Sequence, residues 1–226
     1  MHLLAIDTSA NASAALLEIS NPHNIRIIGS FNSAESNDHA EALAPAIESL
    51  LAEADIDGKN LAGIAVGVGP GPFTGLRVGL ATARTLGFVW GVPLHGVMSL
   101  DAICLDAVRS GVESEFVVAI DARRKEVYWA RYDAAGALLD GPNVTVVEEL
   151  PALPTYGSGA GLYRERLEAI GAVVIEEFQQ ANPSAIALGT RAAQGLAEGE
   201  KLLSTEPLYL RESDAKVPAV MKGKLL

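Results

Sequence analysis

Residues 69–74, Gly-Pro-Gly-Pro-Phe-Thr, form a glycine-rich turn whose composition could support phosphate chemistry. The turn follows the apolar residues 64–68, which predict a buried strand, and precedes a stretch of helical periodicity that ends near Trp90. Free backbone amides at such a strand-to-helix turn can bind phosphate. A P-loop, however, requires lysine and then serine or threonine after its last glycine, where Leu76 and Arg77 stand. We therefore favour close packing of the backbone at this turn, with phosphate binding as the alternative.

Small residues recur every four positions along the helix that follows, at Gly75, Gly79, Ala83 and Gly87. A glycine inside a helix costs roughly 1 kcal/mol relative to alanine, so a close neighbour must offset the loss. That neighbour is either the protein's own sheet or a helix of another subunit, which small residues allow to approach closely. Thr74 is predicted to cap the first turn of this helix.

A second set of candidate residues follows two apolar strands that share the tripeptide Ala-Ile-Asp. Asp7 ends the first strand and precedes Thr8, and Asp121 ends the second strand. In the actin and sugar-kinase architecture, a hairpin aspartate from each lobe faces a nucleotide cleft. Here no glycine follows Asp7, and Arg123 and its neighbours put long side chains where phosphates would lie. The sequence predicts a degenerate nucleotide cleft, and the alternative is that both aspartates cap turns.

The sequence offers little for metal binding or nucleophilic catalysis. A helical two-histidine metal site that includes His39 would need its second ligand at position 43, which is Leu43. The single cysteine, Cys104, excludes an internal disulfide and is expected to be a small buried apolar residue. We therefore expect no metal ion and no assembly of nucleophile, general base and oxyanion hole.

The order of predicted elements repeats in the two halves of the chain. Residues 1–108 predict three strands and then helix, strand and helix, and residues 109–226 begin in the same way. The expected fold is α/β with two lobes of the actin-like or sugar-kinase-like (ASKHA) type, each βββαβα-like and the second reduced. The first lobe would carry the partner-binding helices, and the second would end in a flexible basic tail.

Charge and hydropathy limit the function of the whole chain. Among 226 residues, 28 acidic and 17 basic side chains give a net charge of −11, which opposes binding of nucleic acid by this chain alone. No apolar run is long enough for a membrane span, and the first residues lack the basic region of a secretion signal. We therefore expect a cytoplasmic protein without a membrane partner.

Two predicted helices are unusually apolar, and we expect their shared face to bind another subunit. Packing of this face against the protein's own sheet is the alternative. The face is predicted to contain Leu43, Ile47 and Leu50 from the first helix, and Leu76, Gly79, Leu80 and Ala83 from the second.

Residues 69–79, GPGPFTGLRVG, closely resemble the signature of the TsaB (YeaZ) family, which usually has serine where Pro72 stands. Further features of the family agree in order, so the resemblance spans the whole chain. They are AIDTS at residues 5–9, His39-Ala-Glu, Asp121-Ala-Arg, GSGA at residues 157–160 and PLYLR at residues 207–211.

The resemblance implies a bacterial, noncatalytic scaffold or activator subunit of the machinery that transfers threonylcarbamoyl to N6 of an adenosine. The adenosine lies beside the anticodon of tRNAs that read codons beginning with A. The catalytic paralogue TsaD is expected to dock on the two helices, which places His39 at the interface with the residues named above. TsaE, an ATPase, would join them, and a homodimer would use the same face. tRNA would bind only within the complex, no cofactor is expected, and a nucleotide at the subunit junction stays open.

Two other function classes compete with this one. The first is an actin-fold ATPase or kinase, or a peptidase as the family's older glycoprotease name suggests. The second is a tRNA-binding module that uses Arg123, Arg124, Lys125 and the lysines of the C-terminal tail, but the net charge opposes it. Arg123, Arg124 and Lys125 could form a small anion patch, but we favour a solvated turn.

Overall fold

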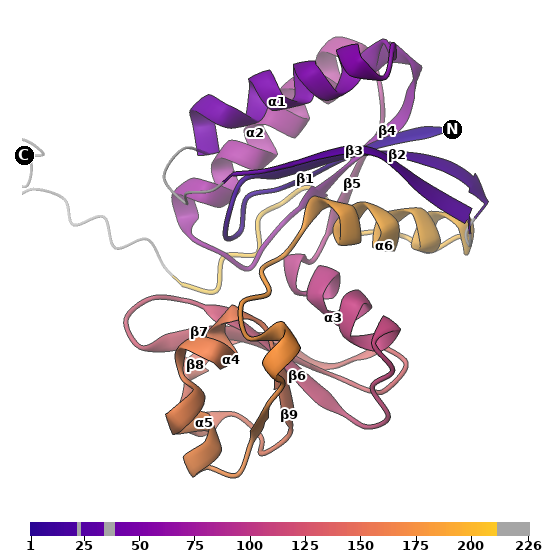
Figure 1. Ribbon diagram of the computed structural model, residues 1–226. Helices are drawn as coiled ribbons and strands as arrows, with labels where there is room; N and C mark the ends of the chain where they lie inside the picture. Colours follow the sequence, from indigo (N-terminus) through magenta and orange to yellow (C-terminus); the bar gives the residue numbers. More distant parts are fainter. Residues whose placement is uncertain (22–23, 34–38, 212–226) are drawn as a thin grey trace, which may run out of the picture.

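The computed structural model describes residues 1–21, 24–33 and 39–211, without the side chains of His39 and Ala40. The predicted basic tail therefore lies outside the described residues. The described chain forms two lobes, each built on a five-stranded mixed sheet, which are stacked one above the other in Figure 1. This arrangement confirms the predicted two-lobed α/β fold.

The first sheet has the strand order β3-β2-β1-β4-β5. β1 pairs antiparallel with β2 and parallel with β4, so its apolar residues are buried on both faces of the sheet. Its strands are β1 (His2–Asp7), β2 (Ser13–Asn21), β3 (Asn24–Asn32), β4 (Leu61–Gly67) and β5 (Leu94–Val97), and the helices that follow β3 and β4 are α1 (His39–Glu53) and α2 (Phe73–Trp90).

The second sheet has the order β10-β9-β6-β7-β8. Read from its other edge, this order is β8-β7-β6-β9-β10, which matches the first sheet when β6 to β10 are taken as the counterparts of β1 to β5. β6 corresponds to β1, and both end in Ala-Ile-Asp. The matching topology supports the predicted internal duplication. The elements are β6 (Phe116–Asp121), β7 (Glu126–Tyr132), β8 (Leu138–Val146), β9 (Pro154–Tyr156), β10 (Val173–Val174), α4 (Ser158–Leu162) and α5 (Arg164–Ala169).

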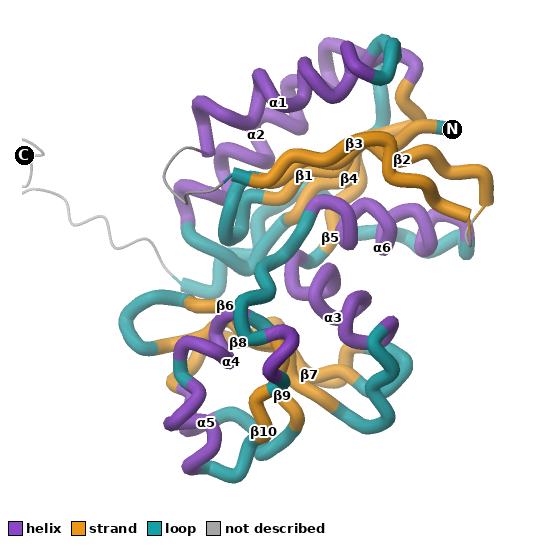
Figure 2. The backbone as a smooth tube through the Cα atoms, in the orientation of Figure 1, coloured by secondary structure: helices purple, strands orange, loops and turns teal. Residues whose placement is uncertain are grey.

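Two helices connect the lobes, α3 (Ser99–Arg109) and α6 (Ala185–Ala197). Figure 2 shows both of them between the two sets of strands. α3 packs on the second sheet through Leu100 and Ile103. α6 covers the face of the first sheet opposite to α1 and α2, where Leu188 packs with Leu3 and Leu17. The division of the chain at residue 108 is therefore wrong for α6, because this helix follows the second lobe in sequence but packs on the first.

Beyond α6 the chain runs back along the first lobe in an extended segment, residues 203–211, which we call the C-terminal strap. Leu203 pairs with Gly96 of β5, and the amide of Leu208 donates to the carbonyl of Val68 at 2.8 Å. Arg211 then donates to the carbonyl of Ala122 in the second lobe at 2.8 Å. The strap thus contacts both lobes.

α2 begins one residue before the predicted cap. Phe73 is its first residue and Pro72 occupies the N-cap position, so the prediction of Thr74 as the cap is wrong. The rigid φ of proline suits the start of a helix, but its side chain offers no oxygen to the first amides. None of the helices among the described residues is long and apolar enough to cross a membrane.

Candidate functional site

The Asp7 turn of the first lobe is buried and hydrogen-bonded to neighbouring parts of the same chain. Asp7 is fully buried, and its carboxylate accepts hydrogen bonds from the amide and hydroxyl of Ser9 at 2.8 and 2.6 Å. The hydroxyl of Ser99, at the start of α3, donates to the other carboxylate oxygen at 2.7 Å. The same hydroxyl accepts from the amide of Gly69 at 3.2 Å. Asp7 therefore joins β1, α3 and the glycine-rich turn.

Burial dominates the electrostatics of Asp7. The loss of hydration raises the pKa of this carboxyl above its ordinary value, and the hydrogen bonds from Ser9 and Ser99 oppose the increase. The donors are hydroxyls and an amide, and none of them carries a charge. Such a carboxyl is suited to holding elements together rather than to binding a metal ion.

Glycines in the signature segment let its backbone pack directly on the Asp7 turn. A Cβ on Gly71 would lie 2.8 Å from the Cα of Ser9, and a Cβ on Gly67 would lie 2.8 Å from the Cγ of Asp7. Nearly two turns into α2, a Cβ on Gly79 would overlap the hydroxyl of Thr8, which donates to the carbonyl of Gly75 at 2.7 Å. The space that phosphates would need beside Thr8 and Ser9 is filled by backbone. The residues of the first lobe therefore do not fit a nucleotide at this turn.

The Asp121 turn of the second lobe has a different environment. Asp121 is only partly buried, and its Oδ1 accepts from the amide of Arg123 at 2.9 Å and from the hydroxyl of Tyr163 at 3.3 Å. Its other oxygen lies 3.6 Å from the guanidinium of Arg123. Asp121 thus caps its turn, and the predicted pairing of two nucleotide-facing aspartates has no counterpart in these contacts. Whether a nucleotide binds at a subunit junction stays a prediction that no contact of this chain tests.

Three exposed basic residues follow Asp121 in the left-handed backbone region. The φ angles of Arg123, Arg124 and Lys125 are 62°, 56° and 66°. Non-glycine residues adopt this conformation at a cost of about 1 kcal/mol each. The structure places these side chains on a solvated turn, as one of the two sequence interpretations expected.

The residues predicted to form the partner interface lie in the core of the first lobe. Leu43, Ile47 and Leu50 of α1 pack with Leu80 and Ala83 of α2 and with the side chains of the first sheet. Leu76 and Gly79 are also buried. The prediction that these seven side chains contact a partner is wrong, because the protein's own sheet occupies that face. His39 belongs to the same prediction, and its side chain lies outside the described residues.

The outer face of α2 carries the apolar residues that the prediction missed. Phe88 is 89% exposed and Val89 is 60% exposed, the highest values among large hydrophobic side chains of this helix. They follow the buried Gly87 at once, so a helical wheel drawn from the glycine stripe would have placed Phe88 outside the core. We define the outer face of α2 as its exposed positions Phe73, Thr74, Arg77, Ala81, Arg84, Thr85, Phe88 and Val89.

The C-terminal strap covers one edge of this outer face. Arg84 donates to the carbonyl of Thr205 at 2.6 Å and pairs with Glu206 at 2.8 Å. Arg77 donates to the hydroxyl of Tyr209 at 3.0 Å, and the ring of Tyr209 stacks on Phe73. These contacts fix α2 between Phe73 and Arg84 and leave Phe88 and Val89, near its C-terminal end, without a contact of this kind among the described residues.

The described parts of the chain contain no cluster of metal ligands and no exposed thiol. No group of three or more histidine, cysteine, aspartate or glutamate side chains could hold a metal ion there. Cys104 is buried, and the loss of hydration raises the pKa of its thiol, which disfavours the reactive thiolate.

Comparisons with known proteins agree with this picture. A sequence model of the family described as TsaD, tRNA N6-adenosine threonylcarbamoyltransferase, matches residues 29–201. The Escherichia coli tRNA threonylcarbamoyladenosine biosynthesis protein TsaB is 28% identical, over 95% of this chain and 96% of its own. YeaZ from Pseudomonas aeruginosa is 30% identical and superposes with a TM-score of 0.75, over 92% of this chain and 99% of its own. The chain belongs to the TsaB (YeaZ) family.

Membership of the TsaB family confirms the expected actin-like fold, which the YeaZ structure shares over nearly its full length. A Mycobacterium tuberculosis protein is 35% identical over 96% of this chain and 95% of its own, so similarity extends through both lobes. Within the resemblance to TsaB, Pro72 replaces the usual serine at the N-cap of α2 and forms no side-chain hydrogen bond there. Leu43, at the position where a helical two-histidine site would need its second ligand, is buried in the core.

Proposed function

We propose that this protein is the noncatalytic scaffold and activator subunit of the complex that forms threonylcarbamoyladenosine in tRNA. In this proposal it binds the catalytic subunit TsaD, TsaE joins the assembly, and tRNA binds only within the complex. The modified position is N6 of the adenosine beside the anticodon of tRNAs that read codons beginning with A. The protein works in the cytoplasm, where these tRNAs are used.

The observation that carries the proposal is the exposure of Phe88 and Val89 on α2, a helix of the lobe that the family resemblance assigns to partner binding. A phenylalanine that is 89% exposed leaves most of its apolar surface in water. Burial of such a side chain by a partner provides the kind of aromatic anchor that dominates protein interfaces. Ala81 and Thr85 lie on the same face, and their small side chains allow a partner helix to approach.

The filled turn around Asp7 supports a noncatalytic role. An ATPase or kinase of this fold would have to admit phosphates beside Thr8 and Ser9, where the backbone of Gly71 already lies. A calorimetric titration of the isolated protein with ATP and magnesium tests this alternative. We expect no saturable heat, whereas micromolar binding with turnover would restore the enzyme hypothesis.

The docking proposal is tested by capture of TsaD on the immobilised protein. Phe88→Glu puts a charge at the centre of the proposed contact and should weaken capture at least about tenfold. Because Phe88 is exposed, the free energy of unfolding should change by no more than about 0.5 kcal/mol. Leu162→Glu is the matched control, since Leu162 is 59% exposed but lies on α4 of the second lobe. Equal capture by Phe88→Glu and by the wild-type protein would contradict the proposal.

Charge favours a homodimer on the same face as a competing state. The exposed charges of α1 include Glu41, Glu48 and Glu53 and no basic residue, whereas those of α2 are Arg77 and Arg84. A two-fold axis that placed α1 of one copy on α2 of the other would bring opposite charges together. Analytical ultracentrifugation with increasing TsaD should show the homodimer decline as the heterodimer forms. If the homodimer persisted at saturating TsaD, the homodimer and the TsaD complex would use different faces of this protein.

A further inference from the structure

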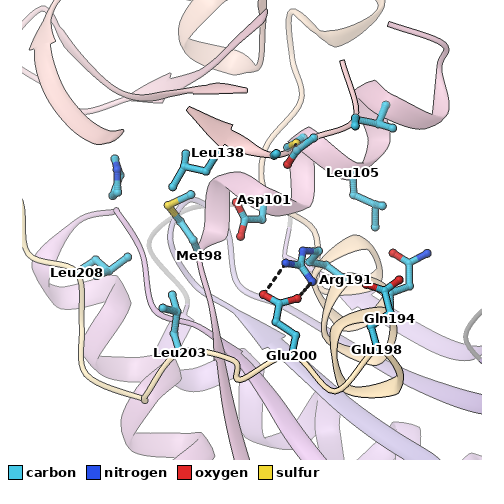
Figure 3. A pocket seen from close by; sticks show the side chains of 16 residues that line it. Met98, Asp101, Leu105, Leu138, Arg191, Gln194, Glu198, Glu200, Leu203 and Leu208 are labelled. Atoms are coloured by element: carbon cyan, nitrogen blue, oxygen red, sulfur yellow. Dashed lines mark hydrogen bonds and ion pairs between the residues drawn. The ribbon is translucent and has the colours of Figure 1, made fainter. Parts of the chain in front are cut away.

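A cavity of about 640 Å³ lies between the two lobes, away from the outer face of α2. It is bounded by α3, by α6, by the loop between β7 and β8, and by the C-terminal strap, so it uses elements from both lobes (Figure 3). Its volume falls within the range of pockets that hold small molecules in proteins. None of the contacts described for the Asp7 turn or the outer face of α2 involves it.

One end of the cavity is polar and carries an incompletely paired carboxylate. Asp101, in the first turn of α3, accepts a hydrogen bond at Oδ1 from the hydroxyl of Tyr132 at 2.9 Å. Among the described residues this is its one hydrogen bond, so Oδ2 remains able to accept another. Figure 3 shows the Asp101 side chain between Met98 and Arg191 on the wall of the cavity.

The charges around Asp101 leave this end of the cavity negative. Arg191 of α6 donates to both carboxylate oxygens of Glu200, at 2.7 and 2.9 Å, so its charge is already matched (Figure 3). Asp101 and Glu198 then remain without a basic partner of their own on the cavity wall. Burial raises the pKa of Asp101 to about 6, and the hydrogen bond from Tyr132 and the charge of Arg191 oppose this increase. A bound cation would offset that desolvation.

The opposite wall of the cavity is apolar. Met98, Leu138, and Leu203 and Leu208 of the strap come from three different segments and line the same space. Leu138 is 47% exposed and Leu203 is 48% exposed, so both retain apolar surface that a ligand could cover. The cavity therefore combines an anionic end with an apolar wall.

We propose that this inter-lobe cavity binds a small amphiphilic amine, whose ammonium group pairs with Asp101 and whose apolar body packs on Met98, Leu138 and Leu203. The ammonium donates to the open carboxylate oxygen of Asp101. Because the walls belong to α3, α6 and the strap, the ligand contacts elements of both lobes at once. The site is independent of the proposed TsaD contact.

The methyl group of Met98 provides a local reporter of binding. The chain has three methionines, Met1, Met98 and Met221, so a protein labelled with ¹³C at the methionine methyl groups gives few signals. Met98→Leu identifies the signal of Met98. Titration with n-pentylamine at neutral pH should shift the Met98 signal to saturation, while the signal of Met1 stays in place. Absence of a saturable shift at Met98 would overturn the proposal.

Two probes of the same chain length separate charge from apolar contact. 1-Pentanol is neutral and pentanoate is anionic, so each should need at least about tenfold higher concentration than n-pentylamine for half saturation. Equal binding of pentanol and pentylamine would contradict the role of Asp101 and reduce the cavity to an apolar pocket.

Asp101→Asn tests the carboxylate directly. The amide oxygen of the new side chain still accepts the Tyr132 hydrogen bond, so the fold should be kept, as circular dichroism would verify. We expect at least about tenfold weaker binding of n-pentylamine. Asp106→Asn is the matched control, because Asp106 lies on the same helix but does not line the cavity. Equal weakening by both variants, or by neither, would overturn the proposal.

Discussion

The turn after β1 and the turn after β6 begin from the same tripeptide at equivalent places in duplicated sheets, yet their environments are opposite. Asp7 is fully buried and accepts three hydrogen bonds, whereas Asp121 is partly exposed and caps a solvated turn. The first turn is closed by the glycine-rich segment and α2. The second is followed by three left-handed basic residues. A strand-end aspartate in this fold can therefore become a structural joint or a surface cap, depending on what packs over it.

This difference explains the role of the glycines along α2, which allow close packing within the first lobe. Gly79 allows the helix to lie on Thr8, and Gly67 makes room for the carboxylate of Asp7. The opposite side of the same helix is free to present Phe88 to a partner. The side of α2 that faces the Asp7 turn thus makes internal contacts, and its outer side is the one proposed to bind a partner.

The largest expected effect comes from a side chain placed between α2 and the Asp7 turn. In Gly79→Val, the added atoms overlap the Thr8 hydroxyl and displace its hydrogen bond to Gly75. We expect a loss of about 4 kcal/mol in the free energy of unfolding, measured by urea denaturation. Ala81→Val adds atoms to the exposed side of the same helix and should cost less than about 1 kcal/mol. Similar losses in the two variants would show that the glycine stripe is not closely packed.

Removal of each strand-end carboxylate compares the two turns directly. Asp7→Ala leaves the Ser9 amide and the hydroxyls of Ser9 and Ser99 without their acceptor, and we expect a loss of about 3 kcal/mol. Asp121→Ala removes an exposed cap and should cost about 1 kcal/mol or less. Both values come from urea denaturation under the same conditions. Equal losses would contradict the contrast between a buried joint and a surface cap.

A smaller effect is expected in the pH dependence of stability. Because burial raises the pKa of Asp7 in the folded state, the folded protein binds this proton more tightly than the unfolded chain. The contribution of Asp7 to stability is therefore complete below the pKa of the unfolded chain, about 4, and declines as pH rises through the folded-state pKa. The wild-type protein should accordingly exceed Asp7→Asn in stability by more at pH near 4 than at neutral pH. If the wild-type protein exceeded Asp7→Asn by more at neutral pH than near pH 4, the result would contradict a raised pKa of Asp7 in the folded state.

The sequence predicted the lobes because strand patterns and the shared Ala-Ile-Asp tripeptide are local signals. It did not predict the position of α6, since periodicity identifies a buried face without naming the sheet that buries it. The same ambiguity affected the predicted partner interface, because the apolar spacing of Leu43 and Ile47 fits a docking face and a core face equally well. The exposure of Phe88 could have been predicted from a helical wheel, which places this residue away from the glycines. The cavity beside Asp101 depends on four segments far apart in sequence, and no local pattern specifies it.

Reconstitution of tRNA modification tests the central account most directly, because it measures activity through the proposed contact. Purified TsaD and TsaE are combined with tRNA, a threonylcarbamoyl donor and ATP, and threonylcarbamoyladenosine is quantified by mass spectrometry. We predict that the wild-type protein and Leu162→Glu support product formation, while Phe88→Glu, although folded, reduces it at least about tenfold. Full activity with Phe88→Glu, or with this protein left out, would contradict a scaffold that acts through the outer face of α2.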